Sequence, residues 1–232
     1  MLLSNNDIKR EIVKAKNISI YPLKLENIKG SSLNLSASKM AWRVSDRKSA
    51  VVADTTIIIP PRDTVCIYTN EAIWVSRRVG GTYHPRVSLV SKGLGHISTT
   101  LDPGWAGVSL VAVNNPSDKE IVINVGEAFV SVMFYYLKTP SSLNDHENLA
   151  SRPDIGKVFD LSPEEHSFLE MSWHRNQSNI TKNMIKSLEY NDLKSQKLKF
   201  RRTLTTITSS PLFSTIFGGI ITGAIIYFLG FN

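Results

Sequence analysis

Hydrophobic and polar residues alternate in short runs through the middle of this chain, and the pattern predicts β-strands. The runs lie between residues 50 and 137 and read AVVADTTIIIP, TVCIYTN, RVSLVS, GVSLVAVNN, EIVINV and AFVSVMFYYL. They are rich in valine and isoleucine, and proline, glycine, asparagine and aspartate separate them, as is typical of strands and turns. Because no helical pattern lies between the runs, we expect an antiparallel β-sandwich or barrel.

Helices are predicted on both sides of this β region. Ser4 can cap a short helix with Asp7 at its third position, and a strand, ISIYPL, follows. Near the other end, Ser162 and Glu165 form a second capping box, with Pro163 at the first helical position. From there to about residue 204 we expect helix with gaps.

The segments after the strands differ in composition. Residues 138–161 are polar, contain two prolines, and are predicted to be a linker. Within residues 162–204, Ile180, Met184 and Leu188 are spaced by four, which indicates one apolar helix face. This basic helical segment is predicted to be a stalk, although its heptad pattern is poor.

An uncharged stretch follows the basic helical segment. Leu212–Phe231 is 20 residues without a charge, within a predicted membrane helix at 211–231. A helix of that length spans roughly 30 Å, the thickness of a hydrocarbon core. Five of the seven net positive charges lie in residues 182–202 and favour a cytoplasmic location for the main domain. The alternative is a buried core helix.

The amino-acid composition excludes several classes of protein and of site. The chain has 232 residues and one cysteine, Cys66, so an internal disulfide framework and a cysteine-rich zinc site are excluded. The first residues carry charges and no apolar core, so a cleaved signal peptide is not expected. The basic segment meets lipid headgroups in the simplest interpretation. Nucleic-acid binding is not expected, because no aromatic residues are interleaved with the charges in a readable pattern.

Four motifs, in order, resemble the dCTP deaminase/dUTPase superfamily. The opening ISIYPLKLENIKGSSLNLSAS is similar to the start of dCTP deaminases. The segment PRVSLVSKGLG resembles the family's phosphate segment, LDPGWAG its Asp-Pro-Gly turn, and VGEAFVSVMF its late motif. The resemblance covers residues 1–137. It implies a distorted all-β jelly roll that forms a homotrimer, with nucleotide sites between subunits.

The resemblance also implies how a nucleotide would be held. Family members bind the triphosphate through backbone amides and basic side chains, usually with Mg²⁺ carried by the nucleotide, and need no zinc. The corresponding nucleotide-binding candidates are Arg86, Ser88, Lys92, His96 and Asp102. No protein ligands for a metal are predicted. Asp102 is the one catalytic candidate, and only if the protein is active.

The chain departs from the family where the chemistry lies. Family deaminases place a glutamate on the strand after the turn, to activate the attacking water. That position falls at Ala112 here, or at Val111 or Val113 with a one-residue slip, and none of these can accept a proton. Val87 and Ser91 replace a serine and an arginine of the phosphate segment. In addition, Asn34 stands in place of an aspartate of the opening motif, and Ser131 in place of a glutamine of the late motif.

Structural interpretations of the same residues stay open. Asp102 can simply cap its turn, since proline fixes φ and glycine accepts a positive φ. Trp105 can be a core residue or a platform for a base. Arg86 and Lys92 can be a solvated pair or a trimer contact, and His96 can be structural.

Two functions follow from these observations. The first is a membrane-anchored, non-catalytic nucleotide-binding protein, a sensor or effector. The alternative is an active dCTP deaminase or dUTP diphosphatase with a rearranged site around Asp102.

Overall fold

Antiparallel strands form the body of this protein. The computed structural model describes residues 1–97, 99–142 and 153–196, and the chain divides into two units, Met1–Tyr190 and Asn191–Asn232. In the first unit the strands are β1 (Ile18–Tyr21), β2 (Leu33–Arg43), β3 (Val51–Val52), β4 (Thr56–Ile59), β5 (Thr64–Val75), β6 (Val79–Pro85), β7 (Gly95–Ile97), β8 (Thr100–Leu101), β9 (Ala106–Asn114), β10 (Ile121–Asn124) and β11 (Ala128–Tyr136).

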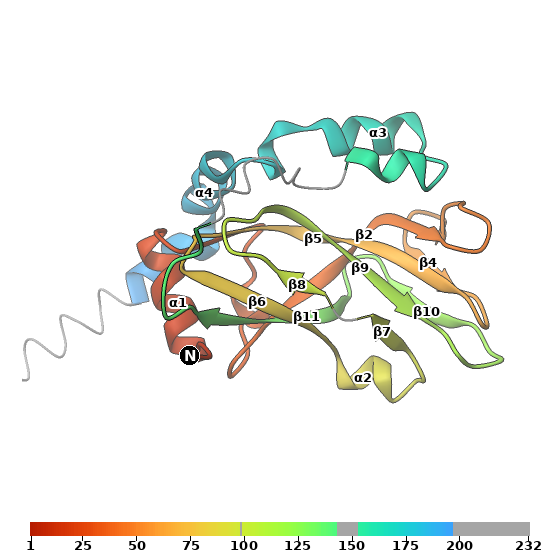
Figure 1. Ribbon diagram of the computed structural model, residues 1–232, viewed down its shortest axis with the longest axis horizontal. Helices are drawn as coiled ribbons and strands as arrows, with labels where there is room; N and C mark the ends of the chain where they lie inside the picture. Colours follow the sequence, from red (N-terminus) through yellow and green to blue (C-terminus); the bar gives the residue numbers. More distant parts are fainter. Residues whose placement is uncertain (98, 143–152, 197–232) are drawn as a thin grey trace, which may run out of the picture. The chain divides into compact units, whose positions relative to one another are not determined.

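Most strands belong to one curled sheet (Figure 1). Its order is β7-β9-β5-β2-β11-β6-β8, with β1 also paired to β5, and a smaller sheet has the order β10-β4-β3. Strand β2 pairs with two strands along its length. Leu33–Ser36 pair with β11, and Ala37–Arg43 pair with β5. The expected all-β domain is confirmed.

The N-terminal helix is confirmed as α1 (Asn5–Lys14). Ser4 and Asp7 form both hydrogen bonds of the capping box, and buried Ile8 and Ile12 attach the helix to the domain. A short 3-10 turn, η1 (Leu25–Asn27), follows β1.

One predicted strand is wrong. The run RVSLVS alternates as a strand would, but residues Val87–Val90 form a helical turn, α2. Its amides fold back, because Leu89 and Val90 both donate to the carbonyl of Arg86, at 2.9 and 3.0 Å. Leu89 is the buried residue of this turn, whereas Val87 is 83% exposed.

A helical strap, residues 153–190, crosses one face of the sheet above β5 and β2 (Figure 1). It contains η3 (Pro153–Lys157), α3 (Pro163–Glu170), η4 (Ser172–His174) and α4 (Gln177–Lys186). The predicted capping box of Ser162, Pro163 and Glu165 is present at the start of α3.

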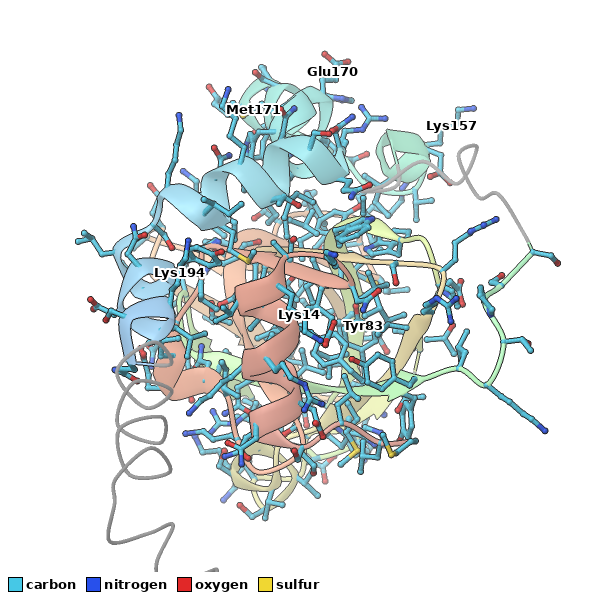
Figure 2. The ribbon with its side chains drawn as sticks, turned by 90° about the vertical axis from the view of Figure 1, so that its left-hand side faces the viewer. Lys14, Tyr83, Lys157, Glu170, Met171 and Lys194 are labelled. Atoms are coloured by element: carbon cyan, nitrogen blue, oxygen red, sulfur yellow. The ribbon has the colours of Figure 1, made fainter. Side chains whose placement is uncertain are left out.

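Aromatic contacts hold the strap on the sheet. Phe159 stacks on Trp42 of β2 with ring centroids 5.6 Å apart, and Trp173 meets Tyr21 edge-on at 5.7 Å. Such pairs contribute about 0.5–1.5 kcal/mol beyond the area they bury. Part of the predicted linker and part of the predicted stalk are therefore packed on the β domain. Figure 2 shows Glu170 on the side of the strap away from the sheet.

The strap is also tied down by polar contacts. The Arg47 guanidinium donates to the carbonyl oxygens of Val158 and Lys157, at 2.6 and 2.9 Å. His174 is fully buried inside the strap, where its Nε2 lies 2.7 Å from the Phe168 carbonyl, and burial lowers its pKa.

Residues 188–190 of the first unit are helical, and so are residues 191–196 of the second unit. Among the described residues, no helix is long and apolar enough to cross a membrane. The segment predicted to do so, Leu212–Phe231, lies outside the described ranges.

Candidate functional site

Asp102 lies in a tight turn between β8 and β9. The Trp105 amide donates to the Asp102 carbonyl at 3.1 Å, and Gly104 has φ +88°, which a type II turn requires at its third residue. The Asp102 carboxylate is exposed and accepts from the Thr100 hydroxyl at 3.2 Å. The turn chemistry explains the sequence Asp-Pro-Gly, and the carboxylate remains open to solvent.

Trp105 is half-buried beside this turn. The Trp105 carbonyl accepts from the amide of Val75 at 3.0 Å, which joins the turn to the end of β5. Its indole N–H is buried and has no hydrogen-bond partner among the described residues.

Arg86 precedes α2 at the end of β6. Its Nη1 donates to the carbonyl of Ala128 at 2.6 Å, which fixes the half-buried guanidinium beside the start of β11. Ser88 and Ser91 are exposed on the same segment, and Ser91 donates to the Ser88 carbonyl at 3.2 Å. The segment therefore carries an anchored guanidinium and two exposed serine residues, which are groups that an anion site can use.

Lys92 follows α2 and is exposed. Its side chain borders an open hollow of about 720 Å³ that residues 117–122 also line. Asp118 in that loop is exposed and pairs with Arg62 at 2.6 Å. His96 lies in β7 with its backbone opposite Val113 of β9, and its side chain is outside the described part of the structure.

Within one chain the candidates fall into two groups. The pairing of β8 with β6 reaches Gly81↔Leu101, so Asp102 lies level with Gly80. Arg86 is about six residues further along, and a strand rises about 3.3 Å per residue, so roughly 20 Å separates Asp102 from Arg86. The structure brings Arg86, Ser88 and Lys92 into one segment and leaves Asp102 at the opposite end.

Ala112, predicted from the family resemblance to stand at the position of the deaminase glutamate, lies on β9. Its neighbours across the sheet are Cys66 on β5 and Ile97 on β7. Burial raises the pKa of the Cys66 thiol, so this thiol stays protonated and is a poor base. Val111 and Val113 point to the opposite, buried face. No proton acceptor therefore pairs directly with Ala112.

The sequence did not reveal a series of buried hydrogen bonds that links several strands of the sheet. Tyr83 meets the Ser109 hydroxyl at 2.5 Å, Ser109 N donates to Thr69 at 3.0 Å, and Thr69 donates to the carbonyl of Glu71 at 2.9 Å. Figure 2 shows Tyr83 inside the domain. Burial raises the pKa of Tyr83 well above its usual range.

Glu71 is the last residue in this series of hydrogen bonds. Its two carboxylate oxygens accept from the amide and the hydroxyl of Ser36, at 2.8 and 2.7 Å. The signal in the sequence was an acidic residue inside a strand, directly before the apolar residues 72–75 of β5. Because both oxygens are satisfied and the residue is 2% exposed, Glu71 is a structural group.

The described residues contain no cluster of three histidine, cysteine or acidic side chains that could hold a metal ion.

Comparisons with known proteins found a family model and relatives that match the β domain. A family model described as dCTP deaminase-like matches residues 2–137. The dCTP deaminase of Pyrococcus abyssi is 29% identical over 141 residues, which are 61% of this chain and 87% of the relative. A probable deoxyuridine 5'-triphosphate nucleotidohydrolase of Sulfolobus islandicus rod-shaped virus 1 is 29% identical over 143 residues, 60% of this chain and 87% of the relative.

A solved structure was also matched. The 2'-deoxycytidine 5'-triphosphate deaminase from Agrobacterium tumefaciens superposes with a TM-score of 0.46 at 14% identity, over 57% of this chain and 46% of that one. The family model ends before the strap begins. Residues 2–137 carry the family's motifs and match its model, and the chain therefore belongs to the dCTP deaminase-like family.

Proposed function

We propose that this protein is a membrane-anchored member of its family that binds a nucleotide without deaminating it. The proposal rests on Ala112 of β9, because the family resemblance places the catalytic glutamate at this position. Water is a poor nucleophile at neutral pH, and deamination needs a positioned group to take its proton. Cys66, which is paired with Ala112 on β5, offers a thiol that burial keeps protonated.

The surroundings of Ala112 support the same conclusion. Leu110 lies two residues earlier on the same face of β9, and Cys66 lies across from Ala112. Both pack against the buried cluster that contains Phe159 of the strap. The strap thus covers the sheet next to the position where a base would act.

Nucleotide binding is proposed at the interface between neighbouring subunits. Arg86, Ser88, Lys92 and His96 of one chain would face Asp102 of a neighbour, because roughly 20 Å separates the two groups within one chain. A homotrimer would close three such sites. The phosphates would be held by the guanidinium and hydroxyl groups, and any Mg²⁺ would be brought by the triphosphate.

Membrane anchoring is proposed for Leu212–Phe231. The segment is uncharged and long enough to span a hydrocarbon core, and the basic residues before it favour a cytoplasmic β domain. In this arrangement the β domain senses a nucleotide and the helical residues connect it to the membrane.

A second candidate function is dUTP hydrolysis at Asp102. It is favoured by the exposed Asp102 carboxylate, which has one described side-chain donor, Thr100. Such a carboxylate can orient an attacking water. Two residues argue against this function. Val87 and Ser91 replace, by the family resemblance, a serine and an arginine that bind phosphate. Each lost charge-assisted hydrogen bond costs about 1.5–3 kcal/mol, or roughly tenfold or more in affinity.

Turnover assays with dCTP and dUTP distinguish the two functions. We expect no deamination of dCTP by the wild-type protein, and none by Ala112→Glu, because the altered phosphate contacts remain. An active dCTP deaminase serves as the assay control. Production of dUTP or dUMP by the wild type, abolished by Asp102→Asn, would establish the enzyme.

Flotation on a density gradient tests the anchor. The full chain is expected to float with vesicles and to need detergent for extraction, whereas a chain ending at residue 210 should stay at the bottom. A full chain that stays in solution without detergent would refute the anchor and favour the core-helix alternative.

A further inference from the structure

Helix α4 is fixed on the β domain by one of its faces. Ile180 and Met184 are fully buried, and the Thr181 hydroxyl lies 2.8 Å from that of Ser19. The amide of Ile20 donates to the sulfur of Met184 at 3.2 Å. These contacts with β1 decide which side chains of α4 face outward.

The outward side combines apolar and basic groups. Ile185 is 42% exposed, and Leu188, just after the end of α4, is 78% exposed. Lys182 and Lys186 are also exposed. They lie three residues before and one residue after Ile185, which places both lysines on the same side of Ile185 around the helix.

A third lysine extends the basic side. Lys24, in the loop after β1, lines a shallow hollow of about 400 Å³ with Lys186 and Ser187. Glu189 is the acidic residue in that lining. We define the α4 surface as the side chains of Lys24, Lys182, Lys186, Ile185 and Leu188. With its neighbour Glu189 included, it carries a net charge of +2.

The sequence places this surface within reach of the proposed membrane segment. Leu212 follows Leu188 by 24 residues. Such a stretch spans roughly 80 Å at full extension and roughly 36 Å as a helix. The stretch between them also carries all five remaining basic residues of the segment 182–202.

We propose that the α4 surface rests on the headgroups of an anionic lipid bilayer. Apolar side chains flanked by lysines are the usual composition of a helix that lies in a membrane interface. The lysines complement anionic headgroups, and Ile185 and Leu188 enter the boundary of the acyl chains. The contact would set how the β domain faces the membrane. This inference rests on the proposed membrane anchor.

Site-specific fluorescence on the full chain tests the contact. In a Cys66→Ala background, Leu188→Cys carries an environment-sensitive dye. The matched control is Val52→Cys on β3, which is paired with β4 at the other end of the domain (Figure 1). Vesicles contain phosphatidylcholine with or without phosphatidylserine, plus a quencher confined to the lipid phase. Flotation is measured on the same samples.

The dye at Leu188 should shift to the blue and be quenched in phosphatidylserine vesicles, and the dye at Val52 should not. Lys24→Glu with Lys186→Glu should reverse the shift, with about a fivefold loss in the docked-to-undocked ratio for each lysine removed.

Three results would overturn the proposal. A chain that floats while Leu188 stays in water refutes the contact and leaves the anchor standing. A chain that does not float refutes both. A shift caused by added nucleic acid and not by vesicles would assign the surface to a different partner.

Discussion

Glu71 lies inside the β domain with both carboxylate oxygens bound to Ser36. Burial raises the pKa of Glu71 above its ordinary value. The folded state therefore holds the proton more tightly than the unfolded state does. The resulting stability is fully present below the unfolded pKa and is lost as pH rises through the folded pKa.

Glu71→Gln should remove this pH dependence while keeping the fold. The amide oxygen can accept from the Ser36 amide, and the amide nitrogen can donate to the Ser36 hydroxyl. We expect the free energy of unfolding, measured by urea denaturation from pH 4 upward, to fall less steeply with pH in this variant. Exposed Glu26→Gln is the control. Identical slopes for wild type and Glu71→Gln would show that Glu71 does not titrate in this range.

The sequence predicted some single residues and missed others. Ser4 and Ser162 were predicted as caps because a capping hydrogen bond is local. The distance between Asp102 and Arg86 could not be predicted, since the pairing of β8 with β6 sets it. The partners of Glu71 are on another strand, so nothing adjacent in the sequence identifies them.

At the scale of elements, the strap depends on its aromatic contacts. Phe159→Ala would remove the ring that stacks on Trp42 and leave a cavity at a site that is 3% exposed. Such truncations cost about 3–5 kcal/mol. We expect a lower melting temperature and faster proteolysis within residues 153–190. The exposed neighbour Val158→Ala should leave both unchanged. Equal proteolysis of the two variants would mean that the stack does not hold the strap.

Two elements show why strand prediction was incomplete. β6 was missed because Gly80 and Gly81 interrupt its apolar run, yet a Cβ at Gly81 would lie 2.7 Å from the carbonyl oxygen of Met133 on β11. α2 was predicted as a strand because its sequence alternates. The backbone turns after Pro85 instead, and one side chain, Leu89, anchors it.

At the scale of the molecule, the central prediction is a homotrimer. The two groups of nucleotide-site candidates lie roughly 20 Å apart in one chain, so a site that used both groups would need a neighbouring chain. Light scattering on a chain ending at residue 196 should give three times the monomer mass. A monomer at tens of micromolar protein would contradict the shared site. Arg86→Glu should weaken nucleotide binding without changing the mass.

The overall architecture was the most predictable level. Alternating runs with turn residues between them indicated an antiparallel β domain, and the motif order gave the family. The packing of the strap was not predicted, because Phe159 lies in a polar stretch that reads as a linker. Its partner Trp42 is distant in sequence, and the contact becomes visible only in three dimensions.

The most direct test follows the chemical fate of dCTP on the protein. Full-length protein in detergent is incubated with dCTP and Mg²⁺, and the retained and released nucleotides are identified by mass spectrometry. We predict that dCTP is retained and recovered unchanged, because Ala112 and its paired residues offer no base. Accumulation of dUTP or dUMP beyond one equivalent per chain, absent with Asp102→Asn, would contradict the account.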